Sequence, residues 1–464
     1  MSRSAPLLPM VTACALALVL TACGGTGDGR GSAGVGDPYF PQAGNGGYDV
    51  SHYALNLEYA PETPTPLTGT ATITARAGQN LSAFDLDLKG MQVKSLTVQG
   101  RKARWTRRGQ ELTVRPSAAL AEGETFRTTV RYSGTPGTIT DPDGSQEGWL
   151  PTADGALALG EPTGSMAWFP GNDHPSDKAT YDITVTVPKG LRAVSNGELR
   201  TETTTGAGRT TSTWRTTQPM ATYLATVAIG HYDITRTTLS NGLPVYVAVD
   251  PHEAAASSKV LARLPEIMEW EEYNFGPYPF SSTGAIVDRR GDAGYALETQ
   301  NRPFFPGAPD TATLVHELAH QWYGDSVTPK TWRDMWLNEG FATYAEWLWS
   351  EDHDGDTAQQ TFDALYRSGG DADVWAFPPA EPTSAAHISD SPVYERGAMV
   401  LHKIRRTVGD ARFYDILQGW AAAHRHGNAD TADFTAYVER MAPGKDFSGI
   451  WKDWLYGDGK PAHP

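Results

Sequence analysis

The spacing of the apolar residues changes once along this chain, and this change limits how the chain can fold. Over residues 48–250, short runs alternate between apolar and polar side chains, as in 181–187, where Tyr, Ile, Val and Val alternate with Asp, Thr and Thr. Such alternation gives a strand one apolar face. Later stretches, such as 257–273 and 310–323, have apolar residues at helical spacing. We therefore expect a domain of antiparallel strands over 48–250, followed by a largely helical domain over 251–464.

The composition excludes several classes of protein. Of 464 residues, 39% are hydrophobic and 20% are charged, which is ordinary for a globular chain and unlike a disordered, collagen-like or coiled-coil chain. A chain of this length accommodates roughly two or three domains. The formal net charge is -16. Because proteins that bind nucleic acid present basic surfaces, we expect no nucleic-acid partner.

The N-terminal residues have the pattern of a bacterial lipoprotein signal. Arg3 precedes an apolar stretch, 7–20, that is too short to span a bilayer. The four residues that end at Cys23 read Leu-Thr-Ala-Cys, which is the form of a lipobox. We expect residues 1–22 to be a signal peptide and Cys23 to carry a lipid anchor, which would hold the exported protein on the outer face of the cell membrane. A plain secretory signal cleaved nearby is the alternative.

The remaining cysteine and the residues after Cys23 complete this prediction. Cys14 lies within the predicted signal, so the mature chain would contain no free thiol, and we expect neither a disulfide nor thiol catalysis. Residues 23–47 are rich in Gly and contain almost no aliphatic side chains. Segments of this composition are typically flexible linkers, so we expect a tether between the lipid and the folded domains.

The sharpest chemical signal is the sequence His-Glu-Leu-Ala-His at 316–320. Residues four apart lie on one face of a helix, so His316 and His320 can bind one zinc ion. Glu317 is turned about 100° from His316 and can act as a general base for water at the metal. Catalytic zinc needs a third protein ligand. Glu339, nineteen residues after His320, is the candidate, although a glutamate in the first turn of a helix is common without a metal.

With these residues, the sequence resembles the gluzincin aminopeptidases, the family of aminopeptidase N and leukotriene hydrolase. The second histidine is followed by Trp-Tyr-Gly-Asp at 322–325, as in that family. Similar segments are Phe-Pro-Gly-Asn-Asp-His-Pro at 169–175, Phe-Gly-Pro-Tyr-Pro-Phe at 275–280 and Asp-Trp-Leu at 453–455. The resemblance implies a multidomain fold, in which an antiparallel β saddle domain precedes a thermolysin-like α+β zinc peptidase domain. It also implies one Zn²⁺ per chain and peptide substrates with a free N-terminus.

The resemblance assigns roles to four further residues. Glu298 and Ala296, in the sequence Ala-Leu-Glu-Thr-Gln, stand where the family binds the free α-amine of the substrate. Glu161 stands where the family has a second side chain that contacts this amine. Tyr394, in Tyr-Glu-Arg-Gly-Ala, stands where a family tyrosine stabilises the reaction intermediate. Taken alone, Glu298 is more often a solvated carboxylate at a strand end, Glu161 a turn residue, and Tyr394 a partly buried core tyrosine whose hydroxyl bonds to the backbone.

The resulting hypothesis is a zinc-dependent aminopeptidase in a short form that lacks the large C-terminal helical domain of many relatives. Tyr295 and Thr299 stand where the family usually has Gly and Asn, so the preferred N-terminal residue of the substrate stays open. The alternatives within enzymes are a zinc endopeptidase and an aminopeptidase with a second hydrolytic activity. A non-catalytic surface lipoprotein that binds peptides is the alternative from another class.

Overall fold

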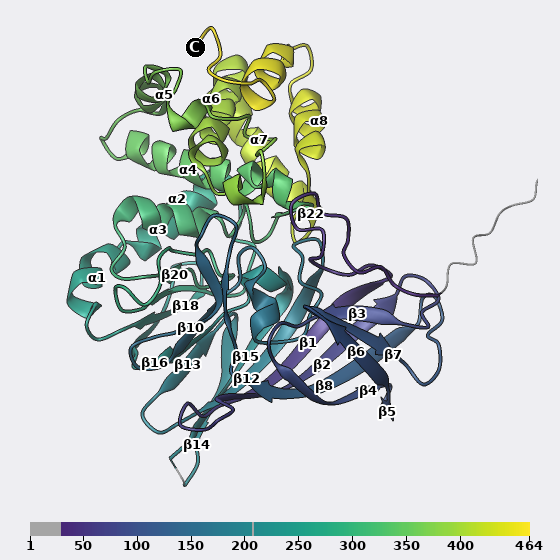
Figure 1. Ribbon diagram of the computed structural model, residues 1–464. Coiled ribbons are helices and arrows are strands. Elements are labelled where there is room, and N and C mark those ends of the chain that lie inside the picture. The colour runs from purple at the N-terminus through teal and green to yellow at the C-terminus, as the bar shows by residue number, and fades with distance from the viewer. Residues whose placement is uncertain (1–28, 207) are drawn as a thin grey trace, which may run out of the picture.

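The computed structural model describes residues 29–206 and 208–464. Three β-sheets occupy the N-terminal half, and helices stacked beside a small fourth sheet form the C-terminal half (Figure 1). The predicted signal peptide and Cys23 lie outside the described residues. Within the described part of the chain, no helix combines the length and the apolarity that crossing a bilayer requires.

The largest sheet has eight strands and forms the base of the N-terminal half. Neighbouring strands are antiparallel except β1 and β12, which run parallel. The alternation predicted over 181–187 is confirmed, because its Tyr, Ile and Val side chains are buried and its Asp and Thr side chains are partly exposed. In spatial order the strands are β14 (Glu198–Thr204), β15 (Thr210–Ala221), β12 (Lys178–Val187), β1 (Tyr48–Tyr59), β2 (Leu67–Ala77), β8 (Thr125–Gly134), β4 (Gln92–Val98) and β5 (Arg101–Lys102).

Two smaller sheets pack against this base. Aromatic contacts join the layers: Tyr59 of the base contacts Trp149 of the five-stranded sheet at 6.1 Å between ring centroids, and Tyr48 of the base contacts Phe84 of the three-stranded sheet at 5.6 Å. The five-stranded sheet contains β13 (Arg192–Ser195), β16 (Val227–Gly230), β11 (Ala156–Leu159), β10 (Gln146–Pro151) and β9 (Thr138–Thr140). The three-stranded sheet contains β3 (Phe84–Asp87), β7 (Glu111–Arg115) and β6 (Arg104–Arg108).

A fourth sheet begins the C-terminal half. Its strands are β17 (Asp233–Thr238), β18 (Pro244–Val249), β19 (Thr283–Val287) and β20 (Phe304–Phe305). The domain boundary predicted at residue 250 therefore falls inside one sheet, between β18 and β19. β17 is largely exposed and β18 is buried on both faces, so neither strand shows the alternation of a half-buried strand, and periodicity does not reveal which sheet they join.

Eight α-helices follow within the described residues. The helical stretch predicted over 257–273 is split into two helices, because Pro265 lies in the first turn of the second and a helix cannot continue through its missing N–H. The helices are α1 (Ala254–Leu261), α2 (Leu264–Phe275), α3 (Thr311–Ala319), α4 (Trp336–Asp352), α5 (Ala358–Tyr366), α6 (Gly397–Val408), α7 (Asp410–Ala423) and α8 (Thr431–Met441). The two-residue strands β21 (Thr328–Pro329) and β22 (Asn428–Ala429) pair beside them.

Lys178, at the start of β12, fastens the two halves together. Its ammonium group donates hydrogen bonds to the carbonyls of Asp325, Ser326 and Gly427 at 2.8, 2.9 and 3.2 Å. Asp325 and Ser326 belong to the loop that follows His320. The sheets of the N-terminal half therefore help to fix the end of the segment that carries the histidines.

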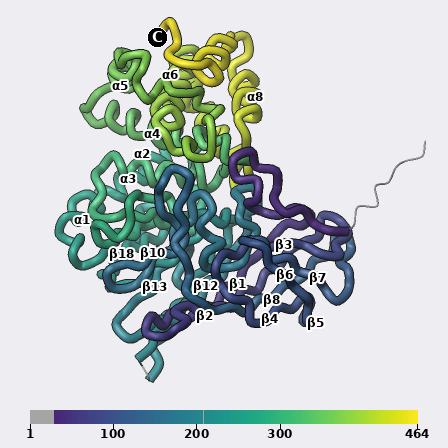
Figure 2. The backbone as a smooth tube through the Cα atoms, viewed as in Figure 1, coloured from purple at the N-terminus to yellow at the C-terminus, as the bar shows by residue number. Residues whose placement is uncertain are grey.

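Residues 29–47 form an ordered strap, and the prediction of a flexible tether is wrong for them. Figure 2 shows the strap, in dark purple, running from beside β3 to the helical half. Asp37 is 2% exposed and lies at its centre. One carboxylate oxygen accepts hydrogen bonds from the N–H groups of Tyr39 and Phe40 at 2.8 Å, and the other accepts from the N–H of Trp332 at 2.9 Å and lies 3.2 Å from Nε2 of His174.

The glycines of the strap serve close packing. A Cβ atom at Gly31 would lie 2.4 Å from the carbonyl oxygen of Gly46, and one at Gly34 would lie 2.1 Å from that of Pro41. Only glycine fits where the backbone turns back on itself at these distances. Composition alone does not distinguish glycines of this kind from those of a flexible linker.

We predict that Asp37→Ala lowers the free energy of unfolding by about 1–3 kcal/mol, because the buried N–H of Trp332 loses its acceptor. Although burial opposes ionisation, hydrogen bonds from His174 and from the backbone lower the pKa of Asp37. Its stabilisation is therefore present above about pH 4 and is lost as the pH falls below that value. Thermal and denaturant unfolding at pH 7 measure the effect. Asp356→Ala, at an exposed aspartate, is the matched control, and equal stability of the two variants would contradict the assignment.

Candidate active site

The residues predicted to bind metal lie where α3 meets α4. Asp310 caps the start of α3 by accepting a hydrogen bond from the N–H of Thr313 at 2.8 Å. His316 lies in the last turn of α3, His320 follows its end, and Glu339 lies in the first turn of α4. The two helices pack side by side, so the three side chains meet in the interior (Figure 1).

The geometry of these three residues fits zinc. Oε2 of Glu339 lies 3.1 Å from Nε2 of His316 and 3.4 Å from Nε2 of His320. Ligands at about 2.0–2.1 Å from a tetrahedral zinc ion are separated by about 3.3 Å. Two nitrogens and one carboxylate oxygen are also a donor set that zinc prefers and that leaves a fourth position open.

The charges of the three residues also favour a divalent cation. Burial opposes ionisation, yet His320 and His316 lower the pKa of Glu339 to about 2. Burial likewise opposes the charge on His320, yet Glu339 and Glu298 raise its pKa to about 9. The site therefore attracts positive charge at neutral pH, and a metal ion can supply that charge in place of protons.

The other ring nitrogen of each histidine has a partner that orients the ring. Nδ1 of His316 lies 2.6 Å from Oε1 of Glu346, and Nδ1 of His320 lies 3.0 Å from the carbonyl oxygen of Tyr323. When Nδ1 donates its proton to these acceptors, the Nε2 lone pair is free to bind a metal. The sequence analysis missed Glu346. Its position seven residues after Glu339, two turns along the same helix face, was the available signal.

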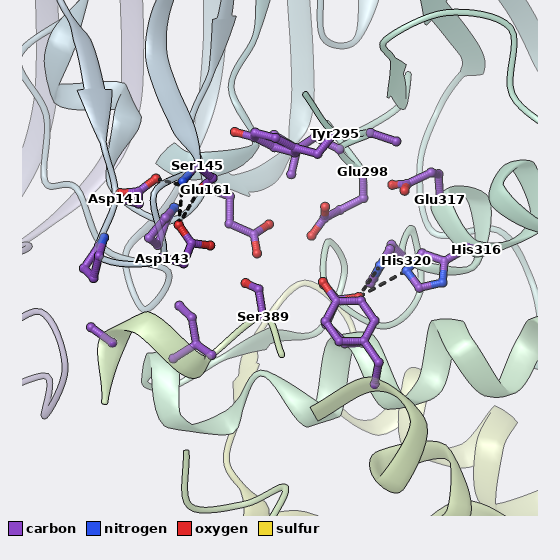
Figure 3. A pocket seen from close by; sticks show the side chains of 18 residues that line it. Asp141, Asp143, Ser145, Glu161, Tyr295, Glu298, His316, Glu317, His320 and Ser389 are labelled. Carbon is purple, nitrogen blue, oxygen red and sulfur yellow. Dashed lines mark hydrogen bonds and ion pairs between the residues drawn. The ribbon is translucent and has the colours of Figure 1, made fainter. Parts of the chain in front are cut away.

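A cavity of about 300 Å³ contains the three residues and extends away from them (Figure 3). It lies between the C-terminal half and the loop that joins β9 to β10. All other residues that the sequence analysis singled out line it: Glu317, Tyr394, Glu298, Glu161 and Ala296. Side chains that are scattered over more than 200 positions of the chain therefore face one space.

Glu317 occupies the position that a general base requires. It is 6% exposed, and one of its oxygens has no hydrogen-bond partner. One carboxylate oxygen lies within 4.8 Å of ligand atoms of His320 and Glu298. Burial raises the pKa of Glu317 to about 8, against the opposing charges of the two histidines. A metal ion beside it would lower this pKa again.

Glu298 and Glu161 form a pair of carboxyl groups beside the metal site. Glu298 is 2% exposed and lies in an edge segment that pairs with β20. Carboxylate oxygens of Glu161, Glu298 and Glu339 lie within 4.8 Å of one another. Burial raises the pKa values of both Glu161 and Glu298; repulsion from Glu298 adds to the effect on Glu161, and repulsion from Glu339 adds to the effect on Glu298. One oxygen of each lacks a partner, so the pair is suited to bind a cation that enters the cavity (Figure 3).

Tyr394 lies in a π-helical turn, Pro392–Arg396, immediately before α6. Its ring stacks on that of His316 at 6.1 Å between centroids, with 13° between the planes. Burial and the nearby Glu339 raise the pKa of Tyr394, so its hydroxyl keeps its proton and can donate a hydrogen bond. Arg396 is fully buried and fixes this turn by donating to the carbonyls of Phe377, Asp453, Trp454 and Gly457.

The end of the cavity away from the metal site is acidic. It is lined by Asp141, Asp143, Ser145 and Tyr295, which the sequence analysis did not include among the site residues. Burial raises the pKa of Asp141 to about 6. Among the residues that the structure describes, no Lys or Arg lines this cavity. A bound molecule with positive charge would therefore meet carboxylates, hydroxyls, histidines and apolar side chains, but no guanidinium or ammonium group.

Comparison with known proteins agrees with this architecture. The sequence profile of the Peptidase M1 N-terminal domain matches residues 49–224, and that of the Peptidase family M1 domain matches 310–454. The M1 zinc metallopeptidase from Deinococcus radiodurans has 32% sequence identity and a TM-score of 0.84, with 93% of this chain and 98% of that chain covered. A mutant of that enzyme was solved with a Tyr-Ser-Ala substrate, and a two-domain M1 zinc metallopeptidase with the same mutation was solved with L-arginine.

The curated relatives are longer proteins. Glutamyl aminopeptidase of Bos taurus is 27% identical over 326 residues, which are 64% of this chain and 34% of that protein. Probable aminopeptidase 2 of Sulfurisphaera tokodaii is 29% identical over 328 residues, which are 63% of this chain and 40% of that protein. The chain thus spans little more than a third of the length of these relatives.

We predict that Glu346→Gln weakens zinc binding by about 10–100-fold, because His316 loses the carboxylate that orients its ring. Competition with a calibrated chelator measures the zinc affinity. Glu269→Gln, at an exposed glutamate of α2, is the matched control. Equal zinc affinities of the two variants would remove Glu346 from the metal site.

Proposed function

Because the chain belongs to the M1 family of zinc metallopeptidases, we propose that it is a zinc-dependent aminopeptidase, which removes the N-terminal residue from peptides. One observation carries the proposal. Carboxylate oxygens of Glu161, Glu298 and the ligand Glu339 lie within 4.8 Å of one another. A substrate ammonium group held by Glu161 and Glu298 therefore lies next to the metal site, and the first peptide bond is the one that reaches the metal.

The proposed mechanism uses the side chains that face the cavity. His316, His320 and Glu339 would hold the zinc ion, which would supply Lewis acidity to the scissile carbonyl and to the attacking water. Glu317 accepts a proton from that water and passes it to the departing amine. The hydroxyl of Tyr394 donates a hydrogen bond to the oxyanion of the tetrahedral intermediate, where charge develops during the reaction.

The carboxyl pair favours an exopeptidase over the zinc endopeptidase alternative. An endopeptidase binds several peptide residues on both sides of the cleaved bond. Here, Glu161 and Glu298 present unpaired buried oxygens where a second residue on the N-terminal side of that bond would have to lie. An uncharged amide at that position would leave these carboxyl groups without a counter-charge. The placement of Glu317 beside the metal ligands favours an enzyme over a non-catalytic peptide-binding protein, because binding alone needs no base.

The acidic lining favours a basic or neutral N-terminal residue over an acidic one. A cavity that selects a glutamyl side chain needs positive charge, and this one has carboxylates at its outer end (Figure 3). The side chain of an N-terminal arginine would instead approach Asp141 and Asp143. The preference of this chain is therefore proposed to differ from that named for its glutamyl aminopeptidase relatives.

The proposal includes export and a lipid anchor at Cys23. The sequence Leu-Thr-Ala-Cys after an apolar segment of signal-peptide length supports it. A tethered enzyme of this kind would act on peptides outside the cell membrane.

We predict that Glu317→Gln abolishes turnover while zinc stays bound, because the amide cannot accept the proton of the attacking water. Metal analysis of the purified variant and hydrolysis of a leucyl reporter measure the two properties. Retained activity would place the base elsewhere. Tyr394→Phe is the companion variant: kcat should fall by about 10²–10³ with KM little changed.

We predict that N-acetylated reporters are hydrolysed about 100-fold or more slowly than free ones, because they lack the ammonium group that Glu298 and Glu161 bind. Among free reporters, the arginyl and leucyl compounds should be cleaved faster than the glutamyl compound. A panel of the three, free and acetylated, tests both expectations, and a chelator should stop all turnover.

Asp141→Asn separates the two parts of this prediction. It should lower the ratio of arginyl to leucyl kcat/KM and leave the rejection of acetylated reporters intact. Asp356→Asn, outside the cavity, serves as the control. Equal rates on blocked and free reporters would exclude the aminopeptidase assignment, and preferred cleavage of the glutamyl reporter would exclude the acidic pocket as its specificity determinant.

A further inference from the structure

The outer face of the three-stranded sheet collects positive charge in an otherwise acidic protein. Arg104 and Arg108 belong to β6, and Arg115 of β7 lies directly opposite Arg104. Because side chains alternate along a strand and opposed residues share a face, all three project from the same side of the sheet. All three are exposed, and none forms an ion pair with another residue of the described chain.

The strap enters the protein on this same face. Asp85 of β3 lies in register with Thr113 of β7, which lies opposite Thr106 of β6. Arg30 pairs with Asp85 at 3.4 Å and is itself 48% exposed. Adjacent strands are about 4.8 Å apart, so Asp85 lies about 10 Å from Thr106, the residue between Arg104 and Arg108, and Arg30 extends the row through its ion pair with Asp85. We call Arg30, Arg104, Arg108 and Arg115 the arginine face.

Acidic groups do not neutralise the arginine face. Asp85 is fully buried and paired with Arg30, and Asp87 is fully buried under the strap, where it accepts a hydrogen bond from Asn45 at 2.9 Å. Glu111 lies opposite Arg108 but is half-buried, and burial raises its pKa to about 7. Arg101 and Lys102, both exposed, precede β6 and add to the charge. Trp105 lies between Arg104 and Thr106 in β6 and by the same alternation projects from the opposite side of the sheet, with Val114 of β7, so it is not part of the arginine face.

The proposed lipid anchor lies close to this face along the chain. Five residues separate Cys23 from Gly29, the first described residue. At about 3.5 Å per residue, the chain from Cys23 to Gly29 reaches no farther than about 21 Å. Gly29 contacts Ser82, two residues before β3. An anchor at Cys23 would therefore keep the arginine face within a few tens of ångströms of the membrane.

We propose that the arginine face rests on the anionic lipid headgroups of the membrane in which Cys23 is anchored. Basic side chains are attracted to such surfaces. The helices α5 to α8 lie at the other end of the molecule (Figure 1), so this orientation points the catalytic half away from the bilayer. The inference rests on the lipoprotein assignment for its anchor, while the charge pattern is independent of that assignment.

Vesicle binding tests the arginine face without the lipid. The chain from residue 23, with Cys23→Ser, is mixed with vesicles of phosphatidylcholine alone or with about one third phosphatidylglycerol, and the bound fraction is measured by sedimentation. Binding should require phosphatidylglycerol and weaken with salt. The triple variant Arg104→Glu, Arg108→Glu, Arg115→Glu should bind about 100-fold more weakly. The triple variant Arg406→Glu, Arg412→Glu, Arg440→Glu, with the same charge change on α6, α7 and α8, should bind like the parent.

Three outcomes would overturn the proposal: unchanged binding by the first triple variant, equal loss in the second, or binding of a soluble polyphosphate in place of vesicles. Hydrolysis of a leucyl reporter by both variants shows that each is folded. The anchor is tested separately in cells, where Cys23→Ser should release active enzyme into the medium. A failure of the lipoprotein assignment is thereby distinguished from a failure of the arginine face.

Discussion

Uncompensated negative charge in the cavity is the constraint on which the site depends. Glu161, Glu298, Glu317, Glu339 and Asp141 face one space, and its only basic side chains among the described residues are two histidines. Buried carboxylates are stable as anions only when positive charge lies nearby. Metal and substrate ammonium can each supply that charge. Occupancy of the site and stability of its ionised form are therefore coupled, so a ligand that binds the folded state also stabilises it.

The metal triad could be predicted from the sequence because local geometry determines it. His316 and His320 are one helical turn apart, and Glu339 opens the next long helix. No such periodicity connects Glu298, Glu161 and Tyr394, which come from an edge segment, a loop and a π-helical turn. Only the resemblance to a known family predicts from the sequence that these three residues belong to one site. The structure shows that they share a cavity, and their chemical roles are part of the proposed function.

The parts that the sequence did not reveal depend on contacts between distant segments. The composition of 29–47 predicts a linker because Gly suits both flexible chains and close packing. The role of Asp37 in the strap is recognisable only once Trp332 and His174 lie beside it. The boundary at residue 250 failed for a similar reason, since β18 gains its partner β19 from beyond two helices. The net charge of -16 gives no indication that arginines gather on the outer side of β6 and β7.

The buried guanidinium of Arg396 links two regions that are far apart in the sequence. Arg396 follows Tyr394 by two residues in the chain. Its guanidinium donates hydrogen bonds to the carbonyls of Asp453, Trp454 and Gly457. The last helical turn of the chain thus acts as a brace for the tyrosine beside the metal site. Disruption of this C-terminal turn would displace the phenol of Tyr394 first. Turnover would then fall, while the fold, metal binding and substrate binding are retained.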